Sequence, residues 1–524
     1  MRIQFIIPEN LSFEDLQSVI QQHTRAHTEP SRTVIRTYYD SFDWRLYRKD
    51  SILEDTHDGN GHMLVWRALK GDSRDARLRL QNAPRFAGDL PQGLFRDQLE
   101  PVLEMRELVP RVRVRSRIHT LRILNKDDKT VACLAVEENK LPRQQGKRSG
   151  ELDNRAIVIP VRGYPKPCKE VVKLLQGQGC MPAQDDLMLA ALLILGEIPG
   201  SYSSRLRLKL DPAMRADQAT RAILHRLLDI IVQNEAGTRT GTDTEFLHDF
   251  RIAIRRTRSA LTQIKAVFPK RIVDRYKNEF NWLGQITSPS RDLDVYLLNF
   301  DKYRDSLPAA MHDDIEPLRD FLIRHQKIEH KALVKALDSA RYRRLITSWR
   351  SFLDQPVKER TTLRNARRAV IEVSSERIWR VYRHAIREGN AIDAESPAYV
   401  LHDLRKTCKK LRYLMEFFQS LYPAEKIRVL IRILKDLQDN LGDFQDYEVQ
   451  AVTLKKISHQ MINEGTVPAD TLLAMGILID GLERRQHQAR AEFSSRFAGF
   501  SQQRNQNRFR KLFASTHTSP DLHA

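Results

Sequence analysis

The sequence predicts an α+β N-terminal part followed by an all-α part, and a chain of 524 residues is long enough for two or three domains. Before about residue 160, several segments alternate hydrophobic and polar residues with a period of two, as half-buried strands do. From Ala213 onward, glycine is sparse and long amphipathic runs with helical spacing follow one another. The charge is also divided unevenly between the two parts.

The formal net charge is +20 at pH 7, and such an excess calls for a partner because like charges repel one another in a compact chain. Residues 1–200 contain 31 Lys and Arg against 27 Asp and Glu, whereas the remainder contains 56 against 40. A basic binding function is therefore expected in the C-terminal part.

The four cysteines show no ligand spacing, which is typical of buried thiols in a reducing compartment. The first residues lack the apolar segment of a signal peptide. The longest apolar run, LMLAALLILG at 187–196, is far shorter than the roughly 20 residues that span a bilayer. We expect a cytoplasmic protein that does not associate with membranes.

Strands are expected at RIQFIIP (2–8), HMLVW (62–66), ARLRLQ (76–81), RVRVRSRIHTLRIL (111–124) and TVACLAVEE (130–138). Hairpin turns are expected around Gly59–Gly61 and at KDDKT (126–130). Helices are expected at 13–24 and within 165–196, and the Gly-, Ser- and Pro-containing segment 198–212 is expected to join two domains.

Arginines occupy every second position of one predicted strand, so all of them point to one side of the sheet. They are Arg111, Arg113, Arg115 and Arg117, and Arg77 and Arg79 repeat the pattern on a smaller scale. Four guanidinium groups cannot enter a dry core without partners. They indicate either a solvated face of the sheet or a tunnel or groove lined for phosphate, which the planar guanidinium group suits.

The C-terminal part contains an internal repeat. LHDFRIAIRRTR at 247–258 recurs as LHDLRKTCKKLR at 401–412, and one offset of 154 residues holds over more than 40 residues without a gap. The matched basic residues are His248 and His402, Arg251 and Arg405, Arg255 and Lys409, Arg256 and Lys410, and Arg258 and Arg412. A constant offset of this kind predicts a duplicated unit.

At about 100° per residue, each copy has an apolar stripe with a basic stripe beside it. In the first copy the stripes are Leu247, Phe250, Ile254 and Leu261, and His248, Arg251, Arg255 and Arg258. Arg and Lys neutralise phosphate oxygens, Arg with bidentate geometry, and a phosphate favours the charged form of a nearby His. Two such copies predict a site for a chain-like polyanion, with inorganic polyphosphate as the first choice.

The repeat can also be interpreted as a structural feature or as a metal site. A single His-x-x-Arg on a helix is usually a surface ion-pair face, and a duplicated structural feature would also persist. A metal site is disfavoured because Arg stands three residues after each His, where a Glu-x-x-His type of motif needs a carboxylate. The recurring acidic residues are expected to act mainly as caps or as partners of basic side chains: Asp292, Asp294, Asp446 and Glu448.

The two copies, with RDLDV and LQDNLGDFQD after them, resemble the CHAD domain, a family of histidine-containing α-helical domains. The resemblance implies a domain at 210–512 made of two pseudo-symmetric four-helix bundles, with repeat one at about 213–355 and repeat two at about 362–510. It also implies a basic pore that binds inorganic polyphosphate. The expected binding residues are His248, Arg251, Arg255, Arg256, Arg258, His402, Arg405, Lys409, Lys410 and Arg412.

Residues 1–200 resemble a CYTH domain, a triphosphate tunnel fold of antiparallel strands, on YYDSFDWRLYR (38–48), RVRSRIHTLRIL (113–124) and VACLAVEE (131–138). Phosphate would then be bound by Arg77, Arg79, Arg111, Arg113, Arg115 and Arg117. However, Arg2 and Gln4 stand where the family's Glu-x-Glu-x-Lys strand carries its second Glu and its Lys, the second strand reads SILED, and Arg67 replaces a typical Lys. Mg²⁺ or Mn²⁺ needs carboxylates at the phosphate, and Glu137 and Glu138 remain as candidate ligands for one ion.

An active triphosphatase is therefore not expected, although metal-dependent hydrolysis of triphosphate or polyphosphate in the CYTH-like part stays an alternative, with Mg²⁺ or Mn²⁺ as its cofactor. Nucleic-acid binding is a second alternative that the net charge permits. Against it, we find no nucleic-acid-reading motif, and no aromatic residues interleave the basic stripes as stacking platforms. Binding of polyphosphate would also allow association with polyphosphate granules.

Overall fold

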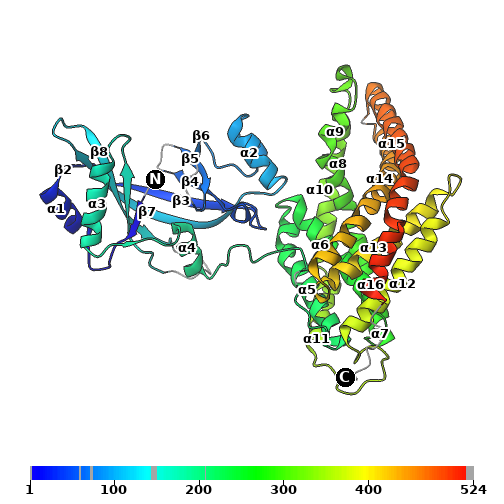
Figure 1. The fold of residues 1–524 in the computed structure, drawn as a ribbon. Coiled ribbons are helices and arrows are strands. Elements are labelled where there is room, and N and C mark those ends of the chain that lie inside the picture. Colours follow the sequence, from blue (N-terminus) through cyan, green and yellow to red (C-terminus); the bar gives the residue numbers. More distant parts are fainter. Residues whose placement is uncertain are drawn as a thin grey trace. The chain divides into compact units, whose positions relative to one another are not determined.

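The computed structural model describes residues 3–57, 61–70, 75–142, 150–206, 208–465 and 467–514. The chain forms two compact units, Met1–Ser203 and Ser204–Ala524, called here the N-terminal and C-terminal units (Figure 1). Arg2, Gly59 and the residues after Ala514 lie outside the described part, so the structure does not test what was expected of them.

The N-terminal unit is built on an antiparallel sheet with the order β10-β1-β9-β8-β7-β3-β4-β5-β6, and β2 pairs with the far end of β7. The strands are β1 (Ile3–Ile6), β2 (Arg25–Thr28), β3 (Arg32–Asp40), β4 (Ser51–His57), β5 (His62–Ala68), β6 (Ala76–Leu80), β7 (Val109–Leu124), β8 (Thr130–Lys140), β9 (Arg155–Pro160) and β10 (Met181–Pro182). The helices are α1 (Phe13–His23), α2 (Leu94–Leu103), α3 (Pro165–Gly177) and α4 (Leu187–Leu195). The expected α+β class with an antiparallel sheet is confirmed.

The turn between β7 and β8 forms at the expected KDDKT segment. The Asn125 N–H donates to the Lys129 carbonyl over 2.9 Å, and the Asn125 side-chain oxygen accepts from the N–H groups of Asp127 and Lys129. Asp128 adopts a left-handed φ of 57°, which short polar side chains tolerate in turns. This turn fixes the register of the longest hairpin in the sheet.

Helices cover both faces of the sheet. On one face, α1 and α3 bury Leu121 and Leu134 near β2, and α2 buries Leu53 and Leu64 at the other end. On the opposite face, α4 packs on Tyr38, Val112 and Val114. Because side chains alternate along a strand, the two faces of β7 have different neighbours.

The C-terminal unit is entirely helical apart from turns and an isolated bridge between Arg215 and Ala369 in its described residues. Its first helices are α5 (Ala216–Thr240), α6 (Thr244–Gln263), α7 (Lys270–Ile286), α8 (Ser288–Leu298), α9 (Phe300–Asp305), α10 (Glu316–Leu337) and α11 (Ala340–Asp354). The second half contains α12 (Val370–Asn390), α13 (Ala398–Phe417), α14 (Ala424–Asn463), α15 (Ala469–Ser501) and α16 (Gln503–Phe513). The expected all-α class is confirmed.

The sequence repeat is also a structural repeat. The first residues of α5 and α12, of α6 and α13, and of α7 and α14 are each separated by the same 154 positions. The copies differ after that point, because α7 and α8 meet at Thr287 where α14 runs on without a break. Pro289 at the start of α8 accounts for the break, since proline lacks the N–H that a continuous helix needs and Asp443 stands at the equivalent position.

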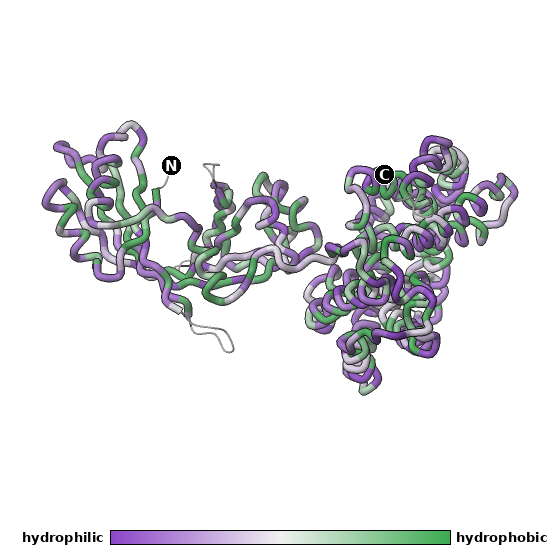
Figure 2. Tube along the Cα trace, turned by 60° about the horizontal axis from the view of Figure 1, so that its bottom comes forward, coloured by the Kyte–Doolittle hydropathy of each residue, from purple (hydrophilic) through white to green (hydrophobic). Residues whose placement is uncertain are grey.

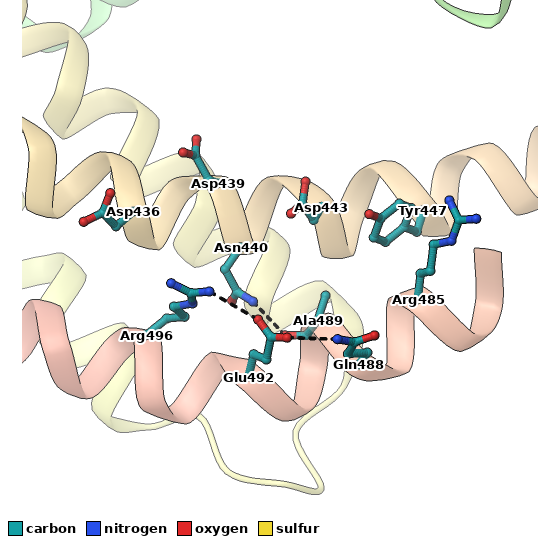
Figure 3. Close-up of a pocket in the computed structure, with 10 residues that line it drawn as sticks. All are labelled: Asp436, Asp439, Asn440, Asp443, Tyr447, Arg485, Gln488, Ala489, Glu492 and Arg496. Atoms are coloured by element: carbon teal, nitrogen blue, oxygen red, sulfur yellow. Dashed lines mark hydrogen bonds and ion pairs between the residues drawn. The ribbon is translucent and has the colours of Figure 1, made fainter. Parts of the chain in front are cut away.

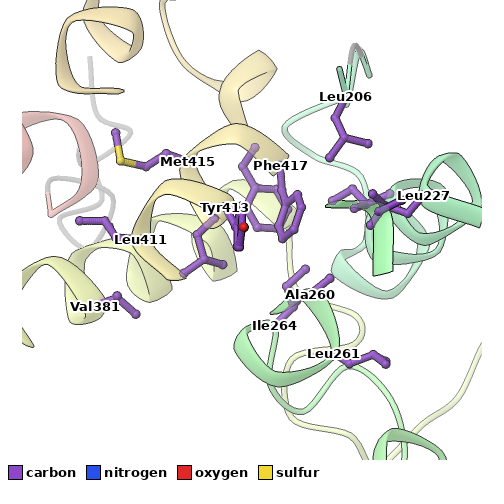
Figure 4. Close-up of a cluster of buried hydrophobic side chains, with 14 of the residues drawn as sticks. Leu206, Leu227, Ala260, Leu261, Ile264, Val381, Leu411, Tyr413, Met415 and Phe417 are labelled. Carbon is purple, nitrogen blue, oxygen red and sulfur yellow. The ribbon is translucent and has the colours of Figure 1, made fainter. Parts of the chain in front are cut away.

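The two repeats share one hydrophobic core. Figure 4 shows Leu227, Ala260 and Ile264 of the first repeat lying across from Leu411 and Phe417 of the second. In the C-terminal unit, hydrophobic and hydrophilic residues alternate along the helices rather than forming long apolar runs (Figure 2). Among the residues that the structure describes, no helix is both long and apolar enough to cross a membrane.

Candidate functional site

The two matched helices bury the apolar stripe that the sequence predicts. Leu247, Phe250 and Ile254 on α6, and Leu401 and Leu404 on α13, are at most 4 % exposed. The Asp243 side chain accepts from the N–H groups of Glu245 and Phe246 and so begins α6. A Cβ atom added at Gly237 of α5 would lie 2.3 Å from the Phe246 ring, so glycine there lets α5 and α6 approach closely and fixes the position of α6.

Equivalent basic residues of the two repeats meet where α6 and α13 pack against each other. Burial, together with the nearby positive charges of Arg405, Arg255 and Arg412, lowers the pKa of the Lys409 ammonium to about 8. Of these, Arg255 belongs to the first repeat and the others to the second. The basic stripes of the two repeats therefore form one continuous cluster.

Arg251 extends this cluster towards the break between α7 and α8. Its guanidinium group donates to the Gly284 carbonyl and to the hydroxyls of Thr287 and Ser288, over 3.2, 2.9 and 3.0 Å. Burial lowers its pKa to about 10, with Asp292 opposing the shift and Arg255 adding to it. Arg251 thus stays charged at neutral pH. The last stripe residue, Arg258, also lies beside Gly284.

His248 and His402 bond residues at equivalent positions of the two repeats, but the residue types of these partners differ. An Arg291 N–H donates to His248 Nδ1 over 3.0 Å, so Nδ1 of His248 is an acceptor. In the second repeat Gln445 stands at the equivalent position, and its side-chain oxygen accepts from His402 Nδ1. The proton therefore sits on different ring nitrogens in the two copies.

Carboxylates accompany the cluster, but of the four recurring acidic residues only Asp446 forms an ion pair with a basic side chain in the described structure. Arg405 donates to Asp446 over 2.9 Å, and Asp294 accepts from Gln326 over 2.9 Å. Burial raises the pKa of Asp292 although Arg251 and the nearby Arg291 act to lower it. Glu448 accepts from Gln445 over 3.2 Å.

Arg291 is a member of the cluster that the sequence reasoning missed. It interacts electrostatically with Arg251 and Arg255 and bonds His248, but its counterpart Gln445 is uncharged. Arg291 therefore does not belong to the set of basic residues that recur in both repeats. The His-x-x-Arg spacing on α6 does not predict a residue that reaches the site from α8.

Two of the expected binding residues do not lie on the basic stripes. Arg256 donates to Glu416 over 2.8 Å and to the Ser204 carbonyl over 3.0 Å, so it joins the repeats. The other oxygen of Glu416 lies 3.5 Å from Arg412, so the charge of Arg256 is neutralised at the edge of the cluster. Lys410 is exposed, and its charge acts on Asp403. Adjacent residues on a helix point about 100° apart, so positions 256 and 410 cannot follow the stripe of Arg255 and Lys409. We call the remaining nine residues the basic cluster: His248, Arg251, Arg255, Arg258, Arg291, His402, Arg405, Lys409 and Arg412.

A groove between α14 and α15 has the opposite charge. It encloses about 580 Å³ and is lined by Asp436, Asp439, Asp443 and Glu492, with Arg485 and Arg496 at its ends (Figure 3). The neighbouring carboxylates help burial to raise the pKa of Asp443. This groove does not suit an anion, so the basic cluster is the candidate anion site of the C-terminal unit.

The N-terminal unit contains a cavity of about 700 Å³ on the face of the sheet that α4 partly covers. Residues from β1 and β10 at one end of the strand order and from β5 near the other line the same cavity, so the sheet curves around it. Its arginines are already bonded. Arg36 donates to both oxygens of Glu137 over 2.7 and 2.5 Å, and Arg67 donates to Asp186 over 2.7 Å.

The arginine ladder lies on the other face. The register pairs Arg36 with Val114 and Tyr38 with Val112, so the cavity-lining residues share the face of the valines, not that of Arg113. Arg113, Arg115 and Arg117 are exposed, and Arg111 donates to the carbonyls of Ser41 and Phe42. The expectation that this ladder lines the tunnel is wrong, and the alternative of a solvated face holds. Arg77 and Arg79 pair with Val65 and Met63 on the cavity side but are exposed beyond its rim.

Glu137 and Glu138 do not form a joint ion site. Consecutive residues of a strand point to opposite faces. Glu137 faces the cavity and bonds Arg36, whereas Glu138 lies 3.5 Å from His119 on the other face. In the described ranges, no three His, Cys, Asp or Glu side chains gather closely enough to hold a metal ion.

Known proteins are similar to parts of this chain. Two uncharacterized proteins of Mycobacterium tuberculosis, MT2285 and Rv2226, are each 24 % identical over 286 residues, which are 51 % of this chain and 54 % of theirs. The chain thus spans about half the length of the curated relatives it matches.

Among solved structures, the CHAD domain of Ricinus communis is 24 % identical, with a TM-score of 0.48 over 56 % of this chain and 95 % of that one. HpAC1 of Hippeastrum is 11 % identical, with a TM-score of 0.27 over 38 % and 99 %. Neither score is high enough to support an argument about the fold. The family model of the CHAD domain matches residues 222–455, which include both basic helices.

Proposed function

We propose that the CHAD domain of this chain binds inorganic polyphosphate along the basic cluster. The observation that carries the proposal is that the basic stripes of both repeats meet where α6 and α13 pack against each other. There the charge of Lys409 is disfavoured by burial and by Arg405, Arg255 and Arg412 together. Several cations held this close raise the free energy of the empty site, because like charges repel more strongly where water is partly excluded. An anion that binds among them removes this repulsion.

The distribution of positive charge favours a phosphate chain as the ligand over a single phosphate. The cluster combines two equivalent basic stripes that meet at Arg255 and Lys409, so its positive charge extends along both helices. A polymer with a regular series of phosphate oxygens can contact both stripes at once, and linked contacts bind more tightly than separate ones. Free phosphate would contact fewer of these cations.

Charge reversal tests this proposal. We expect Arg255→Glu with Lys409→Glu to weaken binding of long-chain polyphosphate at least a hundredfold in a fluorescence-anisotropy titration. The remaining affinity should still fall with salt, because other basic residues persist. The matched control reverses two exposed arginines outside the cluster, Arg428 and Arg484, whose side chains are 66 and 72 % exposed, and should change affinity less than threefold.

Unchanged affinity in the first variant would refute the proposal. So would ready displacement of polyphosphate by duplex DNA or RNA at equal phosphate concentration, because the site would then select charge rather than a phosphate chain. Correct folding of both variants is checked by circular dichroism.

Hydrolysis in the N-terminal unit is not part of the proposal. HpAC1 is described by a dominant triphosphatase activity, and the sequence of this unit resembles a triphosphate tunnel fold. In this chain, however, Arg36 and Arg67 already bond Glu137, Glu54 and Asp186. A phosphate would have to displace these carboxylates before it could bind.

A further inference from the structure

A groove between α12 and α16 of the C-terminal unit combines aromatic, basic and amide side chains. It encloses about 530 Å³, and none of the residues that line it belongs to the basic cluster. Pockets of roughly 300 to 1,000 Å³ hold small ligands and cofactors. The groove therefore has the size of a site for a single small molecule.

The floor of the groove is aromatic and apolar. Trp379, Tyr382 and Ile386 follow one another at spacings of three and four on α12, so they share one face of the helix. The Trp379 and Tyr382 rings are stacked with centroids 5.6 Å apart, and Tyr382 stacks on Phe509 of α16 at 3.8 Å. Trp379 is half-buried, and the Arg383 guanidinium lies over its ring, 6.0 Å from the centroid. A flat ring would stack on Trp379 by displacing this exposed side chain.

One wall of the groove is basic. Arg380, Arg383 and Arg387 stand on α12 beside the aromatic face, Arg510 reaches in from α16, and no acidic residue lines the groove. Arg380 is paired with Glu376 over 3.0 Å. Within the described part of the chain, neither Arg383 nor Arg387 has an ion-pair partner, and both are exposed. These two guanidinium groups are available to phosphate oxygens, which they match in shape and charge.

The opposite wall carries carboxamides. Gln503, Gln506 and Asn507 of α16 line the groove across from the arginines. A carboxamide offers a donor and an acceptor side by side, and this pair matches the amino group and ring nitrogen on one edge of adenine. Gln503 already donates to Asn507 over 3.1 Å and Gln506 to the Ser501 carbonyl over 2.8 Å. Each glutamine therefore keeps its second N–H and its side-chain oxygen for the edge of a base whose face lies on Trp379.

Tyr382 adds an independent observation. The residue is 2 % exposed, and its hydroxyl has no hydrogen-bond partner in the described structure. Burial raises the pKa of this hydroxyl, which stays protonated. A buried hydroxyl without a partner is unfavourable, and phenylalanine would keep the same ring packing without that cost. The hydroxyl oxygen is closed to solvent as well, so a ligand in the open groove contacts the ring of Tyr382 and not its hydroxyl.

From these features we propose that the groove between α12 and α16 binds a purine nucleotide. The base stacks on Trp379 with its edge towards the α16 amides, and the phosphates lie against Arg383 and Arg387. This site is separate from the basic cluster and does not depend on polyphosphate binding there.

ATP is the probe, and adenosine and tripolyphosphate are its two halves. Titration calorimetry uses the full chain with Arg255→Glu and Lys409→Glu, so that phosphate capture by the basic cluster does not contribute. We expect ATP to bind at least tenfold more tightly than either half. Trp379→Ala, or Arg383→Glu with Arg387→Glu, should weaken ATP binding at least tenfold, whereas Arg484→Glu should leave it unchanged.

Tyr382→Phe separates a binding role from a structural one. We expect this variant to melt at a higher temperature without ligand and to bind ATP with unchanged affinity, because the hydroxyl is closed to the groove. A loss of ATP affinity would overturn the placement of the ligand against the Tyr382 ring. The proposal as a whole fails if Trp379→Ala leaves ATP binding intact, if tripolyphosphate binds as tightly as ATP, or if single-stranded RNA binds the groove and ATP does not displace it.

Discussion

Arg255 on α6 lies close enough to Lys409 on α13 to lower the pKa of the lysine, and the two residues hold equivalent positions in the repeats. Each helix turns its apolar stripe into the shared core, so the neighbouring basic stripes are brought together where the helices meet. Duplication has thus joined two moderate basic patches into one cluster, and the following predictions depend on that arrangement.

The affinity for polyphosphate should depend on pH around 8. Lys409 is charged below its pKa of about 8 and neutral above it, and a bound polyanion favours the charged form. We therefore expect affinity to fall by roughly tenfold between pH 7 and pH 9, which is the loss of about one charge–phosphate contact. Calorimetry at pH 8 in buffers of different ionisation enthalpy should show proton uptake. Lys409→Arg should abolish the uptake, and the account fails if it does not.

Removal of the Lys409 charge should stabilise the empty domain. The pKa of Lys409 in the folded chain lies below its ordinary value of 10.5, so the charged form is less favourable in the folded state than in the unfolded state. This cost is present at pH 7 and is relieved as pH rises from about 8 towards 10.5. After allowance for solvent screening, we expect Lys409→Met to raise the free energy of unfolding at pH 7 by about 1 kcal/mol, with loss of binding. Urea unfolding with and without polyphosphate measures both, and lower stability without ligand would contradict this explanation.

Adjacent arginines on α6 should have opposite roles. Arg256 bonds Glu416 of the second repeat, and the two side chains are 16 and 22 % exposed. Arg256→Met should therefore lower stability by about 1–2 kcal/mol, because a half-buried carboxylate loses a partner, and should change polyphosphate affinity less than threefold. Arg255→Met should do the reverse. Equal effects of the two substitutions on affinity would place Arg256 at the ligand after all.

In the N-terminal unit, Arg36 should be structural. It holds Glu137 by two hydrogen bonds and Glu54 at 3.2 Å, and both acidic partners are largely buried. Arg36→Met should destabilise this unit by about 3–5 kcal/mol, because it leaves buried carboxylates unpaired. Adding Glu137→Gln should recover part of the loss. Hydrogen exchange of β3 and β8 reports on this unit alone, and a double variant no more protected than the single one would show that the ion pair is not the cause.

The sequence was sufficient to predict the repeat and the helices that carry it. A helix that buries one stripe fixes where the neighbouring stripe lies, so Arg251, Arg255 and Arg258 could be assigned to the site from spacing alone. Arg256 was also expected at the site, but the structure shows it bonded to Glu416 and the Ser204 carbonyl. Arg291 could not be found this way, because it depends on the break in the chain before Pro289 and has no charged counterpart in the second repeat.

The face of the arginine ladder could not be predicted either. Alternation along β7 separates Arg113 and Arg115 from Val112 and Val114, but it does not say which set faces a cavity. That choice depends on α4, which packs on Val112 and Val114 from 73 or more residues further along the chain. The groove between Trp379 and α16 was missed for a similar reason, since it needs two helices that are distant in sequence.

Chemical footprinting of lysines tests the central claim most directly. Lys409 has a pKa of about 8, so an acylating reagent at pH 8 should modify it readily in the free chain. Lys270, whose side chain is 91 % exposed at the start of α7, is the internal control. We predict that saturating long-chain polyphosphate slows modification of Lys409 at least tenfold and that of Lys270 less than twofold. If polyphosphate binds while Lys409 is modified at its original rate, the ligand does not lie on the basic cluster.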